Sequence, residues 1–128
     1  MHRSCLVLTV CVAAASASAC SDEQSVQCAP LSPAGVAVIV RDSITATLLV
    51  DSARGLVITP TQTDSLRRGP ALQFGDSVLI GGSQVGLVTL RIERTGYQPW
   101  LKSDIQTRLV GSPCPTFVTQ LVTAQLQH

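Results

Sequence analysis

The chain has 128 residues, of which nine are Lys or Arg, eight are Asp or Glu and two are His. The charges nearly cancel and no basic run occurs, so the sequence argues against a nucleic-acid-binding protein. Only four residues are aromatic, whereas Val, Leu and Thr are abundant, which is a composition typical of strands. The length suits one domain that follows an N-terminal targeting segment.

The chain opens with the features of a secretory signal. His2 and Arg3 precede an apolar run at 5–15, and the small residues 17–19 follow it. The run is too short for a membrane-spanning helix, which needs about 20 apolar residues. A basic start, a short apolar run and a small-residue cleavage site predict a signal peptide at 1–19.

Cys20 directly follows the small residue Ala19, and this junction resembles the processing site of bacterial lipoproteins. The resemblance implies that Cys20 becomes the first residue and carries a lipid anchor in a membrane. It also implies a place in the bacterial cell envelope, with the outer membrane favoured because Ser21 rather than Asp follows. The alternative is cleavage by the ordinary signal peptidase, which would release a soluble secreted protein.

The cysteine count predicts one disulfide bond. Of five cysteines, Cys5 and Cys11 belong to the signal, and lipidation would occupy Cys20. Cys28 and Cys114 then remain as a pair in an oxidising compartment, where paired cysteines form disulfides. A metal or redox pair is the alternative, but the spacing is not that of a C-x-x-C motif and no His lies nearby.

Residues 20–34 are polar and contain prolines, so they are expected to form a tether between the anchor and a domain at 35–128. That domain is predicted to be all-β, a single antiparallel β-sandwich of about seven strands. A parallel fold with crossover helices is disfavoured because no connection is long enough. Extended segments are expected at 35–41, 44–51, 56–59, 72–74, 78–80, 85–94, 100–110 and 117–126, with 62–68 as a candidate edge strand, and about seven of them are expected to be strands of the sandwich.

Two of these segments carry the clearest patterns. The segment 35–41 is nearly all apolar, which indicates a central, buried strand. Alternation in 85–94 predicts that Val88, Leu90 and Ile92 face the core. The glycine-rich stretch 81–86 is expected to form a hairpin turn rather than a phosphate-binding loop, because it lacks the G-K-[ST] sequence.

Three blocks of sequence, GVAVIVRDSITA, VGLVTLRIERTGYQPW and CPTFVTQLVTAQL, resemble transthyretin-like (prealbumin-like) domains of the carboxypeptidase regulatory type. The last block also resembles the terminal strand of small bacterial lipoproteins with that fold. The likeness covers about 35–126. It implies a seven-stranded sandwich that acts as an accessory module without catalytic activity.

The residues that usually carry chemistry are sparse. Histidine occurs only at His2, within the signal, and at His128, where we expect a frayed chain end. A Ser-His-Asp site or a histidine zinc site would therefore lack an ordered imidazole. The carboxylates are scattered, mostly in turns, with no calcium-loop spacing. We expect no catalytic residue, no metal site and no cofactor, and the chain is predicted not to be an enzyme.

Tyr97 and Trp100 form the candidate contact surface, and the alternative for both is an anchoring role in the sandwich. The predicted function is that of a membrane-anchored envelope lipoprotein acting as a non-enzymatic interaction or accessory module. Envelope proteins or glycans are its expected partners, bound through loops or the exposed edge 62–68. The alternative is a secreted or anchored β-sandwich that binds a carbohydrate or another small ligand.

Overall fold

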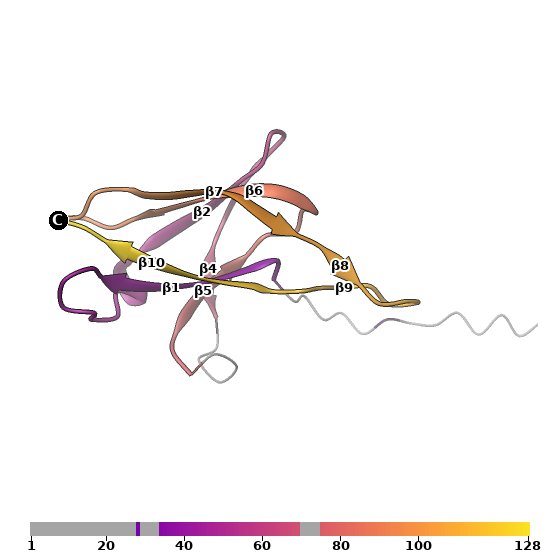
Figure 1. Ribbon diagram of the computed structural model, residues 1–128, viewed down its shortest axis with the longest axis horizontal. Helices are drawn as coiled ribbons and strands as arrows, with labels where there is room; N and C mark the ends of the chain where they lie inside the picture. The colour runs from indigo at the N-terminus through magenta and orange to yellow at the C-terminus, as the bar shows by residue number, and fades with distance from the viewer. Residues whose placement is uncertain (1–27, 29–33, 70–74) are drawn as a thin grey trace, which may run out of the picture.

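The computed structural model describes residue 28 and the ranges 34–69 and 75–128 (Figure 1). The predicted signal peptide at 1–19, the predicted lipidation site Cys20 and most of the tether at 20–34 lie outside these residues. None of the helices in the described ranges has the length and apolar composition needed to cross a bilayer.

Strands are the main regular structure of the described chain, with one 3-10 helix at Val50–Ser52. Two four-stranded sheets have the orders β10-β1-β5-β4 and β3-β2-β6-β7, and β8 and β9 form a separate two-stranded sheet. The strands are β1 (Val36–Asp42), β2 (Arg54–Ile58), β3 (Thr63–Ser65), β4 (Arg67–Gly69), β5 (Val78–Gly81), β6 (Gly86–Glu93), β7 (Trp100–Thr107), β8 (Leu109–Val110), β9 (Thr116–Phe117) and β10 (Gln120–Leu126).

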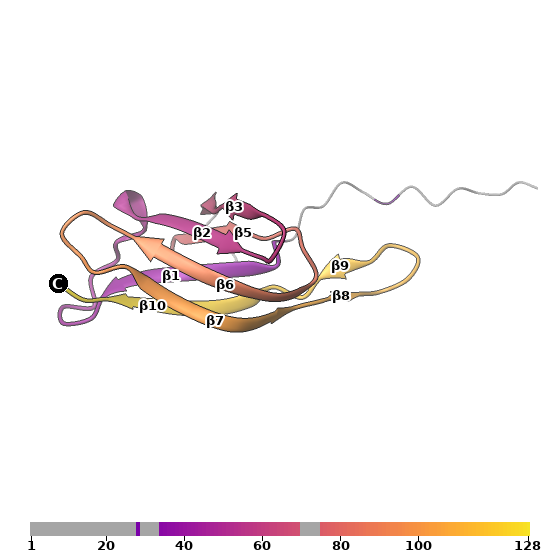
Figure 2. The ribbon, with the colours of Figure 1, turned by 90° about the horizontal axis from the view of Figure 1, so that it is seen from above.

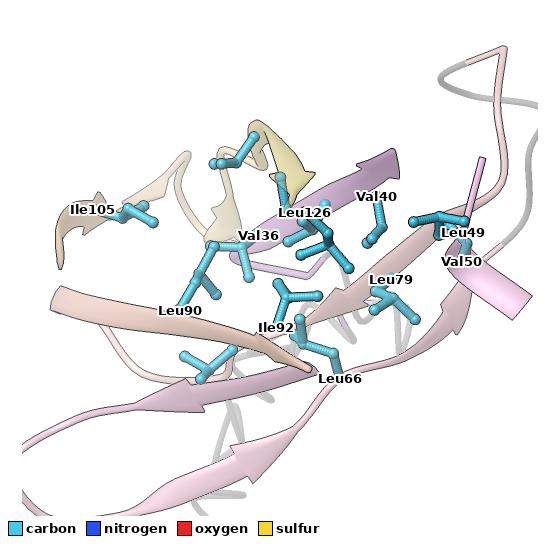
Figure 3. Close-up of a cluster of buried hydrophobic side chains, with 14 of the residues drawn as sticks. Val36, Val40, Leu49, Val50, Leu66, Leu79, Leu90, Ile92, Ile105 and Leu126 are labelled. Atoms are coloured by element: carbon cyan, nitrogen blue, oxygen red, sulfur yellow. The ribbon is translucent and has the colours of Figure 1, made fainter. Parts of the chain in front are cut away.

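The two larger sheets face each other and enclose one apolar core (Figures 1 and 3). Alternate residues of each strand point inward because successive side chains of a strand leave on opposite faces. Val88, Leu90 and Ile92 of β6 are buried, which confirms the predicted inward face of that strand. They meet valines of β1 and residues of β10, including Leu126, from the opposite sheet. The result is a sandwich-like all-β fold.

One side of the sandwich is closed by a chain that passes from sheet to sheet. Strand β3 pairs with β2 in one sheet, and after Leu66 the chain continues as β4, which pairs with β5 in the other. Leu66 lies in the core at this crossing, where its N–H donates to the carbonyl of Gly55 over 2.8 Å. The predicted edge strand 62–68 is therefore two short strands that belong to different sheets.

The prediction of a purely antiparallel sandwich is wrong at one pairing. Strand β1 is central, as its apolar sequence indicates, but its neighbour β10 runs parallel to it from Val36↔Gln120 to Asp42↔Leu126. A parallel pair cannot be joined by a tight turn and needs a long connection. Here nearly the whole domain provides that connection, so local sequence gives no sign of the pairing.

The described residues hold ten strands rather than about seven. The long expected strand 100–110 divides into β7 and β8, and the expected strand 117–126 is divided between β9 and β10. At the first division the chain leaves a four-stranded sheet for the small β8–β9 sheet, and at the second it leaves the small sheet for the other four-stranded sheet. The expected strand 72–74 lies outside the described residues.

Two further predictions of local structure are wrong. The segment 44–51 is not a strand, because the chain turns after Asp42 and then forms the 3-10 helix. Ile44, near the start of the expected strand, is 81% exposed. The glycine-rich stretch 81–86 is not a hairpin turn either, since β5 and β6 belong to opposite sheets and the stretch connects them.

Candidate functional site

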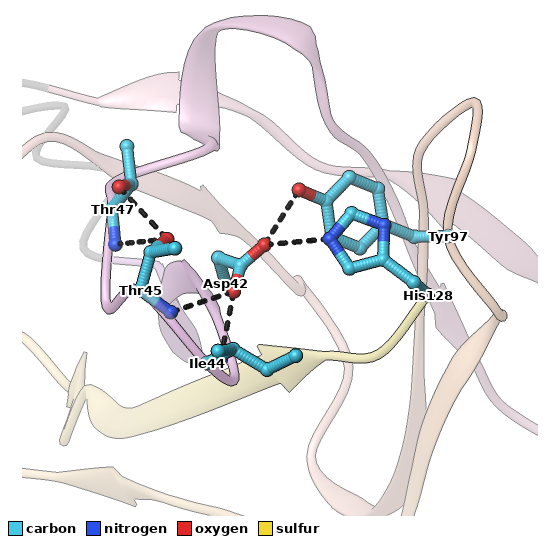
Figure 4. Close-up of polar contacts among 6 residues, drawn as sticks. All are labelled: Asp42, Ile44, Thr45, Thr47, Tyr97 and His128. Carbon is cyan, nitrogen blue, oxygen red and sulfur yellow. Dashed lines mark hydrogen bonds and ion pairs between the residues drawn. The ribbon is translucent and has the colours of Figure 1, made fainter.

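A polar cluster surrounds the carboxylate of Asp42, which has four hydrogen-bonding partners (Figure 4). Its Oδ1 accepts hydrogen bonds from the N–H groups of Ile44 (2.7 Å) and Thr45 (2.9 Å). Its Oδ2 accepts a bond of 2.7 Å from the Tyr97 hydroxyl and lies 3.0 Å from Nε2 of His128. The carboxylate is thus bonded at both oxygens while only 4% of Asp42 is exposed.

Local chemistry explains why the chain turns at this point. Asp42 ends β1, and an aspartate side chain that accepts from the next residues stabilises a turn in place of a continuing strand. The N–H of Ala46 donates to the backbone carbonyl of Asp42, and Ala46 has a φ of 57°. Strand pairing therefore stops although the apolar alternation continues.

Long-range contacts bring the other two side chains to this turn. Tyr97 lies in the turn between β6 and β7, where Gly96 has a φ of 86° and the Tyr97 N–H donates to the carbonyl of Arg94. His128 follows β10, and its ring centroid is 4.2 Å from that of Tyr97. Gln98 holds this part of the chain, because its N–H and its side-chain amide donate to the carbonyls of Gln127 and His128.

These hydrogen bonds change the ionisation of two groups. The pKa of Asp42 is far below the usual aspartate range, first because the Thr45 N–H bonds to the ionised form, and then because the Tyr97 hydroxyl and the Ile44 N–H do so. The pKa of Tyr97 is raised, because its hydroxyl donates to the carboxylate and because burial disfavours the phenolate. An ionised carboxylate only accepts hydrogen bonds, so Nε2 of His128 carries the hydrogen that faces Asp42.

The expectation that His128 is frayed is therefore wrong. A carboxylate that orients an imidazole also occurs in hydrolytic triads, where the second ring nitrogen acts on a hydroxyl or thiol. In the described ranges, however, His128 makes side-chain hydrogen bonds only with Asp42, and no Ser, Thr or Cys side chain is bonded to it. As it stands, the cluster can orient His128 and join three distant segments.

The two residues of the predicted contact surface differ in their surroundings. Tyr97 is directed at Asp42 and also lies under the Arg94 guanidinium, whose carbon is 5.1 Å from the ring centroid. Trp100, which begins β7, packs partly against the core. It also lines a surface groove of about 360 Å³ together with Gln98, Pro99, Leu101, Gln125 and Gln127.

A larger cavity lies beside the β8–β9 hairpin and has a volume of about 530 Å³. Leu109, Pro115 and Phe117 supply an apolar wall from the hairpin, while Asp64 and Arg67 come from β3 and β4. The remaining lining residues are Ala34, Ser65, Gly81, Gly82, Ser83 and Thr116. This volume falls within the range of small-molecule sites, which is about 300–1,000 Å³.

The predicted cysteine pair is joined in the structure. Cys28 and Cys114 form a disulfide bond, with their Cα atoms 5.5 Å apart and a sequence separation of 86. Cys114 lies between β8 and β9, so the bond fixes the segment that precedes the sandwich to the turn of this hairpin. Among the described side chains, no group of three or more His, Cys, Asp or Glu could hold a metal ion.

Comparisons with models of protein families, with curated proteins and with solved structures find no match to this chain. The likeness of 35–126 to transthyretin-like domains therefore stays a prediction, as does the likeness of Cys20 to a lipoprotein processing site.

Proposed function

We propose that this chain is an envelope lipoprotein, anchored in a bacterial membrane through Cys20, that acts as a non-enzymatic interaction or accessory module. The Cys28–Cys114 disulfide is the observation that supports this most directly. Structural disulfides are typical of proteins that fold outside the reducing cytoplasm, where lipoproteins are processed. The signal-like sequence 1–19 and the cysteine that follows it agree with that route.

The same disulfide favours a module held at a membrane. It fixes Cys28, only eight residues after Cys20, to one end of the sandwich. The domain then presents its other end, with Trp100 and the Asp42 cluster, away from the anchor. The loops at that end are the surface that we expect envelope partners to contact, because loops on a rigid sandwich commonly carry binding residues.

Intact mass tests the anchor and the bond together. The chain is produced in a bacterium with lipoprotein-processing enzymes, extracted from membranes and weighed before and after reduction. We expect a polypeptide that begins at Cys20, carries acyl groups and gains two hydrogens on reduction. A Cys20→Ser variant is the matched control and should lose the acyl mass while it keeps the disulfide. A wild-type chain that is soluble and unacylated would contradict the proposal.

The groove at Trp100 supports a second candidate, the binding of an uncharged glycan. An indole ring offers an apolar face to a sugar ring, and the amides of Gln98, Gln125 and Gln127 can each donate to and accept from hydroxyl groups. No charged residue lines this groove. The lining of this groove therefore suits a neutral, hydroxyl-rich ligand, which agrees with the contact role predicted for Trp100.

The single tryptophan makes this candidate easy to test. Soluble neutral oligosaccharides, such as oligomers of N-acetylglucosamine, are titrated against the protein while the emission of Trp100 is followed. Binding in the groove should change the emission saturably, and Gln125→Ala should weaken the binding several-fold. Gln62 lies outside the groove, so Gln62→Ala serves as the control variant. An emission that no glycan alters would remove this candidate and leave the anchored interaction module.

A further inference from the structure

The β8–β9 hairpin differs from every other pair of described strands. It forms a two-stranded sheet of its own and extends beyond the end of the sandwich (Figures 1 and 2). Leu109 and Val110 are 43% and 46% exposed, and Phe117 is half-buried on the facing strand. A two-stranded hairpin is marginally stable in water by itself. The disulfide bond to Cys28 constrains the turn of the β8–β9 hairpin at Cys114.

The hairpin also lies in a long segment without charge. From residue 109 to residue 128 the sequence contains no Asp, Glu, Lys or Arg. Single exposed apolar side chains are common, whereas several that stand together can mark an interaction surface. The composition of this tip, with Leu, Val, Pro and Phe, suits the boundary between lipid headgroups and acyl chains more than it suits water.

The short segment between Cys20 and Cys28 limits the distance between the anchor and the tip of the hairpin. Seven residues separate Cys20 from Cys28, and a fully extended chain of that length spans at most about 27 Å. Since Cys28 is bonded to Cys114, the tip of the hairpin cannot lie much farther than this from the lipidated residue. Strand β7 begins at Trp100 and runs eight residues toward the hairpin (Figure 1). At about 3.3 Å per residue this strand is about 23 Å long, so Trp100 lies at the opposite end of the sandwich from the hairpin.

We propose that the β8–β9 hairpin rests on the membrane that holds the Cys20 anchor, with Leu109 and Val110 in the lipid interface. This inference depends on the proposed anchor. The surface that the hairpin contacts is a lipid bilayer rather than a protein. Contact at two points, the acyl chains and the hairpin, would orient the sandwich. The groove at Trp100 and the Asp42 cluster would then point away from the bilayer.

Quenching of tryptophan by brominated lipid tests the contact in the complete acylated chain. In a Trp100→Phe background, one reporter variant carries Val110→Trp and a second carries Leu109→Trp, so that one can replace the other if it misfolds. The control reporter is Leu101→Trp, which is 60% exposed at the opposite end of the sandwich. Each chain is inserted into vesicles of phosphatidylethanolamine and phosphatidylglycerol with brominated acyl chains.

The hairpin reporters should lose most of their emission and shift to shorter wavelength, while the Leu101→Trp reporter keeps the emission of a water-exposed indole. Vesicle flotation and intact mass establish the anchor separately. An acylated chain that floats with the vesicles, but whose hairpin reporters stay unquenched, would overturn the docking and leave the anchor intact. Equal quenching at both ends would also overturn it. A chain without acyl groups would remove both proposals.

Discussion

The Tyr97 hydroxyl donates a 2.7 Å hydrogen bond to the carboxylate of Asp42, although Tyr97 lies 55 positions later in the sequence. The bond connects the turn after β1 with the turn that joins β6 to β7, and so links the two sheets at one end of the sandwich. His128 completes the contact from the segment after β10. Three parts of the chain thus converge on a single carboxylate.

The phenol of Tyr97 should titrate above the ordinary tyrosine range. Its pKa is raised because the hydroxyl donates to the Asp42 carboxylate and would lose that bond on ionisation. The chain has one tyrosine, so the phenolate absorbance in an alkaline titration reports this group alone. In Asp42→Asn the midpoint should fall toward its usual value. A wild-type midpoint at about 10, the ordinary value, would contradict the contact.

Stability should fall in acid through Asp42. Its folded-state pKa lies below the value in the unfolded chain, so its contribution is fully present above about pH 4 and is lost as pH falls further. Asp42→Asn removes the charge that the four donors stabilise. The variant should unfold at lower temperature at neutral pH and lose less stability between pH 5 and pH 3 than the parent.

Thermal unfolding followed by circular dichroism across that pH range measures this effect. Asp64→Asn is the matched control, because the Asp64 carboxylate accepts a side-chain hydrogen bond only from the exposed Gln62 among the described residues. That substitution should leave the acid limb of the stability curve unchanged. Parallel curves for the parent and Asp42→Asn would show that the carboxylate makes no special contribution.

The sequence allowed parts of this fold to be predicted because local patterns determined them. The inward face of β6 follows from strict alternation, and the central position of β1 follows from its continuous apolar residues. The parallel pairing of β1 with β10 could not be predicted, because neither strand carries a local mark of its partner's direction. The strand expected at 44–51 was also wrong, since the hydrogen bonds to the Asp42 carboxylate extend the turn through Thr45.

The candidate site was harder to predict than the fold. Cys28 and Cys114 could be paired by counting, because few alternatives remained once the signal was set aside. The Asp42 cluster had one readable local signal, an aspartate followed by a turn. Its partners Tyr97 and His128 come from 55 and 86 residues away, and only the packing of the two sheets brings them there.

The sandwich register can be tested with two leucines of one strand. Leu90 of β6 is fully buried between the sheets, whereas Leu87 of the same strand is 57% exposed. Leu90→Ala leaves a cavity in the core and should cost about 2–5 kcal/mol of the free energy of unfolding. Leu87→Ala should change it by less than about 0.5 kcal/mol. Urea unfolding measures both, and similar losses would contradict the predicted faces of β6.

Removal of the disulfide should lower the free energy of unfolding, because the unfolded chain regains the conformational freedom that the bond restricts. Cross-linking residues that are 86 apart restricts the unfolded chain, and the chain-entropy model gives about 4–5 kcal/mol for a loop of that length. The double variant Cys28→Ser/Cys114→Ser should therefore unfold at a lower urea concentration than the parent. Cys20→Ser, which leaves the pair intact, is the control and should match the parent. An unchanged midpoint in the double variant would mean that the bond acts only on the hairpin and the segment before β1.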